Sequence, residues 1–207
     1  YPILGTIAQI NAFALGAQMT NPRAKVYLEW STLKEQDIEK RIDEIDPNCI
    51  SGKDIIVPDD NNHFYGVYHR ERGGGEQKNL AMPLCHWGKF YEELIRTIMA
   101  GNWEQDNDVE KAINYWWGMP TGVVDVICSK KLPAGTVRLV NVLKHNYKTG
   151  QFHTFTDQMY AQGHILKEKK GETLSPEEVI EMDWLAENII GRIPKIEEFQ
   201  EQAKPVL

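Results

Sequence analysis

Segments in which apolar residues recur at helical spacing alternate along the chain with shorter segments rich in β-branched and aromatic residues. In residues 1–22 one helical face is apolar, Phe13 flanks it, and Asn21-Pro22 ends the run. That face consists of Ile3, Ile7, Ile10, Ala14 and Ala17. Residues 24–30, AKVYLEW, have the composition of a strand that ends in Trp30. The pattern therefore predicts a helix followed by a strand.

The same alternation continues to residue 102. Thr32 is placed to cap a helix over residues 33–45, whose apolar positions suit packing on a sheet. Residues 54–57 are predicted to form a short strand that Pro58 ends, and residues 64–71 another. Residues 88–101 are predicted to form an amphipathic helix, which His86-Trp87-Gly88 opens and Gly101-Asn102 ends. Its apolar stripe consists of Phe90, Tyr91, Leu94, Ile95, Ile98 and Met99.

In the second half, residues 123–128 are predicted to form a strand, and VRLVNVLKHNYKTG a helix that Gly150 ends. Residues 155–168 have the pattern of a hairpin with Gln162-Gly163 at its turn. Ser175-Pro176-Glu177-Glu178 is a helix start, because it combines a capping serine, a proline at the first position and a glutamate three residues on. We expect that helix to continue through Leu185 and to stop at Gly191. The alternation of strands and helices predicts an α/β fold with a parallel sheet flanked by helices.

Charge and composition exclude several classes of function. The net charge is −7, whereas a nucleic-acid partner requires a basic surface. No apolar run reaches the roughly 20 residues that span a bilayer. The cysteines, Cys49, Cys85 and Cys128, are isolated, and no spacing of histidines or carboxylates predicts a metal site or a cofactor. No nucleophile motif or carboxylate cluster is visible, so we do not expect an enzyme.

Unusual side chains follow several of the predicted strands, at the edge of a parallel sheet where ligands commonly bind. Candidates are Trp30, Asp59, Tyr68, Arg70, His86, Trp87 and Trp117. Aromatic faces, a carboxylate and helix-terminal N–H groups suit a flat, polar ring such as a purine. Each residue also has a structural interpretation: a tryptophan next to a strand packs in the core, and the Asp-Asn run at 59–62 forms a turn.

Five segments of the chain resemble sequences of a known protein family. HWGKFYEELIRTIMAGNW, followed by NYWWGMPTGVVDVICS, is similar to the basic membrane protein family, which comprises substrate-binding lipoproteins of ABC transporters related to the purine nucleoside receptors. YPILGTIAQINAFALGAQMTNPRAKVYLEW, GQFHTFTDQMYAQGHIL and LSPEEVIEMDWLAENIIGRIP match in the same order. The resemblance covers most of the chain.

This resemblance implies a type I periplasmic-binding-protein fold, with two α/β lobes that close on a ligand. Residues 1–207 would be the C-terminal part, mainly one lobe; about residues 84–113 would belong to the other lobe or to the crossover, and the N-terminal lobe would be absent. The first predicted helix also lacks the strand that normally precedes it, so we expect the chain to be cut from a longer protein. By the resemblance, the ligand-binding residues are Tyr1, Trp30, Asp59, Tyr68, Arg70, His86, Trp87 and Trp117.

The implied function is the solute-binding component of an ABC-type importer that takes a nucleoside or purine-like ligand. Its partner would be the permease in the membrane, and the full-length protein would be extracytoplasmic and lipid-anchored. Two departures from the family leave an alternative open. Only DDNNH separates the strands DIIVP and FYGVY, where the family has a helix, and Tyr-His-Arg-Glu replaces an acidic, sugar-binding signature. Arg70 would favour an anionic ligand group; alternatively, the chain is a ligand-sensing regulatory module of the same fold.

Overall fold

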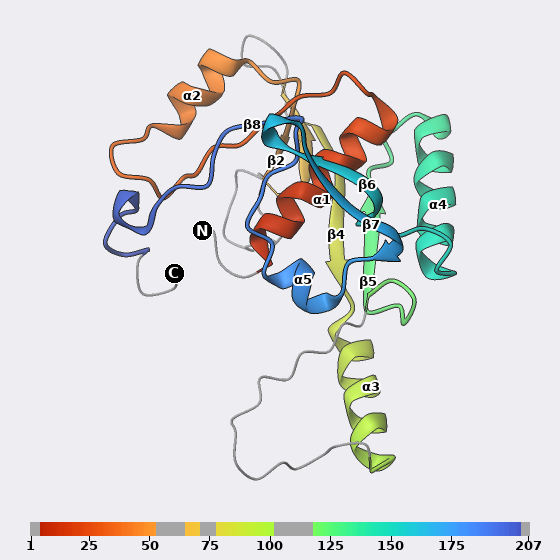
Figure 1. The fold of residues 1–207 in the computed structure, drawn as a ribbon. Coiled ribbons are helices and arrows are strands. Elements are labelled where there is room, and N and C mark those ends of the chain that lie inside the picture. The colour runs from red at the N-terminus through yellow and green to blue at the C-terminus, as the bar shows by residue number, and fades with distance from the viewer. Residues whose placement is uncertain (1–4, 53–64, 71–77, 102–117, 204–207) are drawn as a thin grey trace. The chain divides into compact units, whose positions relative to one another are not determined.

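The computed structural model describes residues 5–52, 65–70, 78–101 and 118–203, without the side chains of 168–171. The chain divides into two compact units, and Figure 1 labels their helices and strands. Unit 1 consists of residues 1–45 and 153–207, and unit 2 of residues 46–152. The strand predicted over residues 54–57 lies outside the described residues.

Unit 1 is built around helix α1 (Thr6–Thr20) and two small sheets. Strands β1 (Val26–Tyr27) and β8 (Ile189–Ile190) pair in parallel, although 161 residues separate the end of β1 from the start of β8 in the chain. Strands β6 (Thr156–Ala161) and β7 (Ile165–Thr173) form an antiparallel hairpin. The remaining elements are α2 (Ile38–Ile45), η1 (Gln162–His164), α5 (Pro176–Ile180) and η2 (Ile196–Glu198).

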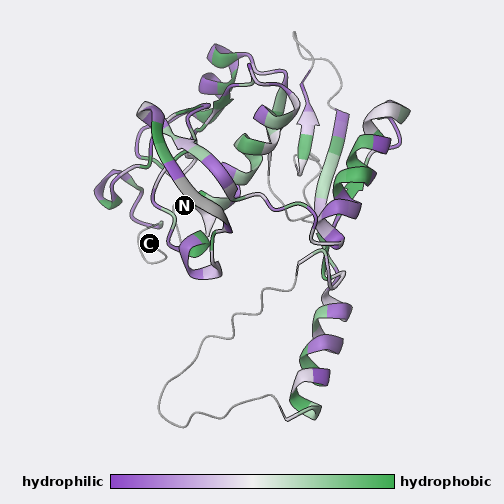
Figure 2. Cartoon of the chain, turned by 45° about the vertical axis from the view of Figure 1, so that its right-hand side comes forward, coloured by the Kyte–Doolittle hydropathy of each residue, from purple (hydrophilic) through white to green (hydrophobic). Residues whose placement is uncertain are grey.

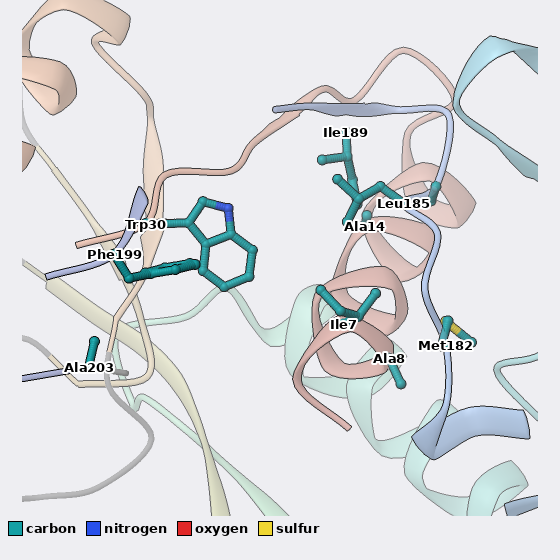
Figure 3. Close-up of a cluster of buried hydrophobic side chains, with 10 residues drawn as sticks. Ile7, Ala8, Ala14, Trp30, Met182, Leu185, Ile189, Phe199 and Ala203 are labelled. Carbon is teal, nitrogen blue, oxygen red and sulfur yellow. The ribbon is translucent and has the colours of Figure 1, made fainter. Parts of the chain in front are cut away.

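The core of unit 1 joins α1 to the C-terminal segment of the chain. In Figure 3, Ile7 and Ala14 project from α1 on the side where Leu185 and Ile189 lie, and Trp30 lies beside Phe199. The rings of Trp30 and Phe199 meet edge to face, with centroids 6.3 Å apart, and Phe199 is fully buried. Removing a buried aromatic ring of this kind typically costs about 3–5 kcal/mol.

Two buried asparagines tie α1 to the same segment. The Asn11 amide donates to the Trp184 carbonyl at 2.7 Å, and its oxygen accepts the Ala186 N–H at 2.8 Å. The Asn188 amide donates to the Ala14 carbonyl at 2.8 Å. Because buried polar groups are costly unless they are bonded, these contacts fix the position of the 182–189 segment on α1.

Unit 2 contains a four-stranded antiparallel sheet in the order β2-β3-β4-β5. Its strands are β2 (Cys49–Ser51), β3 (Val67–His69), β4 (Lys78–Cys85) and β5 (Val124–Cys128). Helix α3 (Trp87–Met99) follows β4, and α4 (Ala134–Lys148) follows β5 and contacts it. The Lys144 ammonium lies 2.6 Å from the Asp125 carboxylate of β5 and donates to the Val126 carbonyl at 3.0 Å, which attaches α4 to the sheet.

Helix α3 exposes one apolar stripe to solvent. Along it lie Trp87, Tyr91, Ile95 and Met99, spaced four residues apart. Trp87 is 62% exposed and Met99 82%. Figure 2 shows apolar positions interspersed with polar ones along the helix. Side chains four apart share a helical face, so they form a continuous apolar surface that no described residue covers.

The predicted α/β fold with a parallel sheet and helices is confirmed, with the parallel pairing in β1 and β8. The sheet of unit 2 differs from the expectation, because its neighbouring strands are antiparallel. Only eight residues connect β3 to β4, and a parallel crossover needs about a dozen or more. That connection therefore reverses the chain.

Most predicted elements of the second half are confirmed. The hairpin turns at Gln162-Gly163, where Gly163 has φ +77°. Helix α4 ends before Gly150, which has φ +68°, and Ser175 caps α5 through a capping box with Glu178.

The prediction that α5 continues through Leu185 is wrong, because the helix ends at Ile180. The Asn11 side chain binds the backbone of Trp184 and Ala186, and this contact holds the chain in a non-helical conformation.

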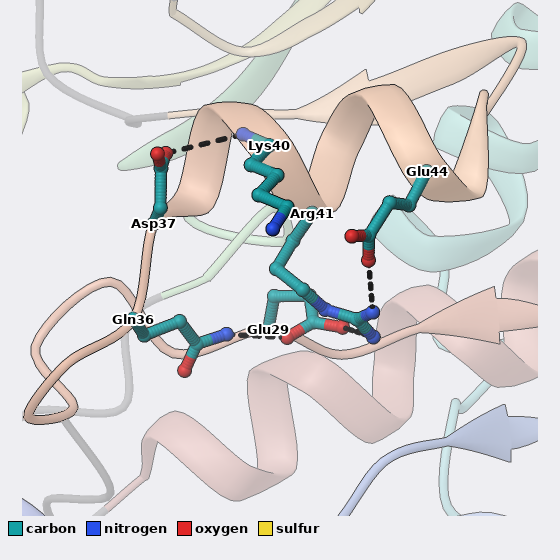
Figure 4. Close-up of polar contacts among 6 residues, drawn as sticks. All are labelled: Glu29, Gln36, Asp37, Lys40, Arg41 and Glu44. Atoms are coloured by element: carbon teal, nitrogen blue, oxygen red, sulfur yellow. Dashed lines mark hydrogen bonds and ion pairs between the residues drawn. The ribbon is translucent and has the colours of Figure 1, made fainter.

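The start predicted for α2 is also wrong. The helix begins at Ile38, and the Asp37 carboxylate accepts the Lys40 N–H at 3.1 Å, so Asp37 caps it rather than Thr32 (Figure 4). Leu33 pairs with Phe199 instead, and Glu35 has a left-handed φ of +57°. Arg41 then joins α2 to Glu29 at 2.8 Å.

Candidate functional site

His86 and Trp87 lie where β4 ends and α3 begins. The His86 side chain is exposed and makes no capping hydrogen bond to the helix. The Trp87 indole is 62% exposed and lies edge to face with the ring of Phe90, with ring centroids 5.9 Å apart. Both side chains are therefore accessible for contact with a ligand or with another part of a protein.

A second segment adjoins this position from the start of β5. The His86 N–H donates to the Val123 carbonyl at 2.8 Å, and Val124 donates to Gly118 at 3.4 Å. A Cβ added to Gly122, which has φ +75°, would meet the Lys89 side chain at 3.5 Å. The structure thus brings Gly118–Val123 to the same end of the sheet as His86.

Tyr68 and Arg70 belong to β3 and the residue that follows it. Tyr68 is 5% exposed and pairs with Asn79 of β4 and Ile50 of β2. Burial raises the pKa of the Tyr68 phenol, and the charge of Arg70 opposes that shift. Arg70 is half-buried, and its backbone N–H donates to the Asn48 carbonyl at 3.2 Å.

Strand β4 separates these two groups of candidates. Tyr68 lies opposite Asn79, near the start of β4, whereas His86 follows its last residue. Seven residues of extended chain at about 3.3 Å each give a separation of about 23 Å. The structure therefore brings His86 and Trp87 together, but it does not bring Tyr68 or Arg70 to them.

Trp30 is a core residue of unit 1. It is 6% exposed, and its indole N–H donates to the Arg192 carbonyl at 2.8 Å. Contact with Phe199 covers part of its ring. These contacts give Trp30 a structural role, and its role in ligand binding stays a prediction.

Tyr1, Asp59 and Trp117 lie outside the described residues. Within the described part of the chain, no group of three His, Cys, Asp or Glu side chains is arranged to hold a metal ion. In the same residues, no helix combines the length and the apolar composition needed to cross a bilayer. The three cysteines form no disulfide.

A hollow runs along α3, next to the predicted site rather than at its centre. Among the described residues, its lining consists of Gly88, Tyr91, Glu92, Ile95, Arg96, Met99 and Ala100. Sequence reasoning placed Tyr91, Ile95 and Met99 on an apolar stripe but did not identify this surface as a candidate site, and it did not place the Gly118–Val123 segment beside His86. The Thr121-Gly122 turn directly before a β-branched strand was the available signal for the second of these.

Two known proteins are similar in sequence to this chain. A purine-binding protein of Brucella abortus (strain 2308) is 24% identical over 205 residues, which cover 94% of this chain and 57% of that protein. A candidate ABC transporter glucose-binding protein of Haloferax volcanii is 30% identical over 135 residues, which cover 59% of this chain and 32% of that protein. The chain thus spans little more than half of the first relative and a third of the second. No protein-family model matches it.

By their names, both relatives are binding proteins, and one is associated with ABC transport. At low identity, the two similarities support a relationship between this chain and substrate-binding proteins.

Proposed function

We propose that the chain is part of the solute-binding component of an ABC-type importer, and that it binds a nucleoside or purine-like ligand in a cleft between two lobes. The observation that carries this proposal is the similarity to a purine-binding protein along 94% of the chain. The resemblance to the basic membrane protein family supports the same ligand class. In this proposal the protein performs no catalysis and needs no cofactor.

The chain corresponds, in this proposal, to the C-terminal part of a longer protein and supplies mainly one lobe. The exposed stripe of α3 supports the assignment of about residues 84–113 to the other lobe or to the crossover. An apolar face with Trp87, Tyr91 and Ile95 about half or more exposed requires a covering surface. Polypeptide of the other lobe is the occupant that we propose.

His86 and Trp87 form the part of the binding site that the described geometry supports best. Trp87 offers an exposed indole for stacking on a base, and His86 offers a ring nitrogen for a hydrogen bond. Trp117 directly precedes Gly118, which lies at the same end of the sheet. Tyr1, Trp30 and Asp59 complete the site by the family resemblance. Tyr68 and Arg70 lie at the far end of β4 from His86. Their role in ligand binding, which the family resemblance implies, is therefore a separate proposal.

The partner in the membrane is the ABC permease, which recognises the closed, ligand-bound form. Closure follows because a ligand that contacts both lobes only in the closed state shifts the population towards that state. The proposed location is extracytoplasmic, with a lipid anchor in the full-length protein.

Calorimetric titration of the longer protein with adenosine tests the site. Trp87→Ala should weaken binding by about 1–3 kcal/mol, the scale of one lost stacking contact between a base and an aromatic ring. Trp87→Phe, which keeps an aromatic face, should retain most of the affinity. Tyr160→Ala is the matched control, since Tyr160 is an exposed aromatic residue of β6 that belongs to neither the proposed site nor the stripe of α3. Equal affinities in wild type and Trp87→Ala would remove Trp87 from the site.

A sugar is the second candidate ligand, and the similarity to a candidate glucose-binding protein favours it. Sugars also stack on exposed aromatic rings, so Trp87 would serve either ligand. Titrations with glucose and with adenosine under the same conditions separate the two. Saturable heat with glucose alone would replace the purine ligand by a sugar and leave the solute-binding function intact.

A further inference from the structure

Positive charge is concentrated in one segment of an otherwise acidic chain. Residues 126–156 contain five lysines and arginines and no aspartate or glutamate, in a chain whose net charge is −7. The five are Lys130, Lys131, Arg138, Lys144 and Lys148. The segment comprises the end of β5, helix α4 and the connections on either side of the helix.

Helix α4 has an inner face and an outer face. Val137, Val140 and Leu143 are partly buried on the inner face, on the side that contacts β5. Lys144 belongs to this side, because its ammonium pairs with Asp125 of β5. That contact lowers the pKa of the Asp125 carboxyl, so the ion pair persists at neutral pH. Asp125 thereby neutralises one of the five cations.

The outer face of α4 mixes basic and apolar side chains. Arg138, Val142 and His145 follow one another at helical spacing, with Leu139 beside them. Leu139 is 50% exposed and Val142 56%. Arg138 and Lys148 are exposed, and within the described residues no carboxylate forms an ion pair with Arg138. We call this set of Arg138, Leu139, Val142, His145 and Lys148 the α4 surface.

We propose that the α4 surface docks on an acidic, partly apolar surface of a partner protein. The inference rests on the proposed function, which supplies the permease as the partner. The charge of the surface requires an acidic counterpart, and exposed aliphatic groups beside arginine fit the composition of protein interfaces. A membrane surface fits less well, because a helix that lies on lipid separates a polar face from a purely apolar one. Here the inner face is occupied by the sheet, and the outer face is mixed.

Binding of the longer protein to defined probes at low ionic strength tests this surface. The probes are poly-L-glutamate, a glutamate–tyrosine copolymer, and vesicles of phosphatidylglycerol and phosphatidylcholine. Arg138→Glu combined with Lys148→Glu should reduce the affinity for poly-L-glutamate at least about tenfold, because like charges then face the probe. Arg23→Glu combined with Lys25→Glu is the matched control, with the same change in net charge at two exposed residues of unit 1. The control should change the affinity less than about twofold.

The copolymer tests the apolar half of the surface. It should bind more tightly than poly-L-glutamate, and Leu139→Ser combined with Val142→Ser should remove that gain.

Vesicles that bind as tightly as the polypeptides would overturn the proposal in favour of a lipid surface. The proposal would be overturned altogether if the Arg138→Glu, Lys148→Glu variant and the control lost equal affinity for poly-L-glutamate. It would also be overturned if neither polypeptide bound to the protein. An adenosine titration of the same samples distinguishes failure of this proposal from failure of the proposed function. The α4 variants should bind adenosine as wild type does. If wild type does not bind adenosine, that result counts against the proposed function alone.

Discussion

Unit 1 buries a cluster of apolar side chains around α1, whereas unit 2 leaves the stripe of α3 exposed to solvent. Ile7, Leu185 and Phe199 are each 5% exposed or less. In unit 2, the buried hydrophobic residues among those described are Tyr68 and Val123. The comparison shows that unit 1 provides packing partners for α1, while no described residue covers the stripe of α3.

The short length of α3 and its weak ion pair are the reasons why we expect the helix to need a covering surface. The helix has 13 residues, and isolated helices shorter than about 12–15 residues are marginal in water. Its Glu92–Arg96 ion pair, at 2.6 Å, is exposed and contributes little. We therefore expect packing of the Trp87–Met99 stripe, rather than helix propensity, to stabilise α3 in the longer protein.

The largest effect should come from Phe199→Ala. This change removes a fully buried ring and should lower the free energy of unfolding of unit 1 by about 3–5 kcal/mol. Met99→Ala removes a side chain that is 82% exposed and should change the stability of the 207-residue chain by less than about 0.5 kcal/mol. Urea denaturation followed by fluorescence measures both. Equal losses of unfolding free energy in Phe199→Ala and Met99→Ala would contradict the distinction between the buried core of unit 1 and the exposed stripe of α3.

Asn11→Leu should give the next largest effect. It leaves the Ala186 N–H and the Trp184 carbonyl buried without their partner, at a cost of about 2–3 kcal/mol. Gln9→Leu, at an exposed position of the same helix, is the control. If both variants unfold at the same urea concentration, the Asn11 contacts do not hold the 182–189 segment.

Hydrogen exchange should reveal a smaller effect at α3. Its backbone amides should exchange about tenfold to a hundredfold more slowly in the longer protein than in the 207-residue chain, because a covered helix opens less often. The amides of α1 should exchange equally in both. Unchanged exchange at α3 would contradict the proposal that another lobe covers this helix.

The smallest effect concerns the exposed pair of Arg192 and Glu198 in unit 1. Arg192 lies 2.6 Å from Glu198 and, with the Lys195 N–H, lowers the pKa of that carboxyl from 4.5 to about 2. Because the folded-state pKa is depressed, the pair stabilises the fold above about pH 4.5, and this contribution is lost as the pH falls towards 2. NMR titration should show the Glu198 pKa rising towards its ordinary value in Arg192→Gln. A pKa that does not move would exclude Arg192 as the cause.

Local chemistry made several elements predictable from the sequence. Gly150 and Gly163 adopt left-handed φ values that other residues disfavour, so the end of α4 and the turn of the hairpin could be placed. Ser175 and Glu178 form a capping box from residues three apart, which marks the start of α5. Each of these signals acts within a few residues of the feature that it determines.

Contacts between distant residues decided what the sequence could not predict. The end of α5 depends on Asn11, about 170 residues earlier in the chain, and the start of α2 depends on the pairing of Leu33 with Phe199. The same holds for the candidate site. Antiparallel register places Tyr68 and His86 at opposite ends of β4, and no local pattern encodes that register.

Native mass spectrometry of the longer protein, purified without added ligand and then mixed with adenosine, tests the central claim most directly. We expect either a retained small molecule with the mass of a purine or nucleoside, or a stoichiometric shift when adenosine is added. A protein that retains nothing and gives no shift with adenosine, inosine or guanosine would contradict the proposed function.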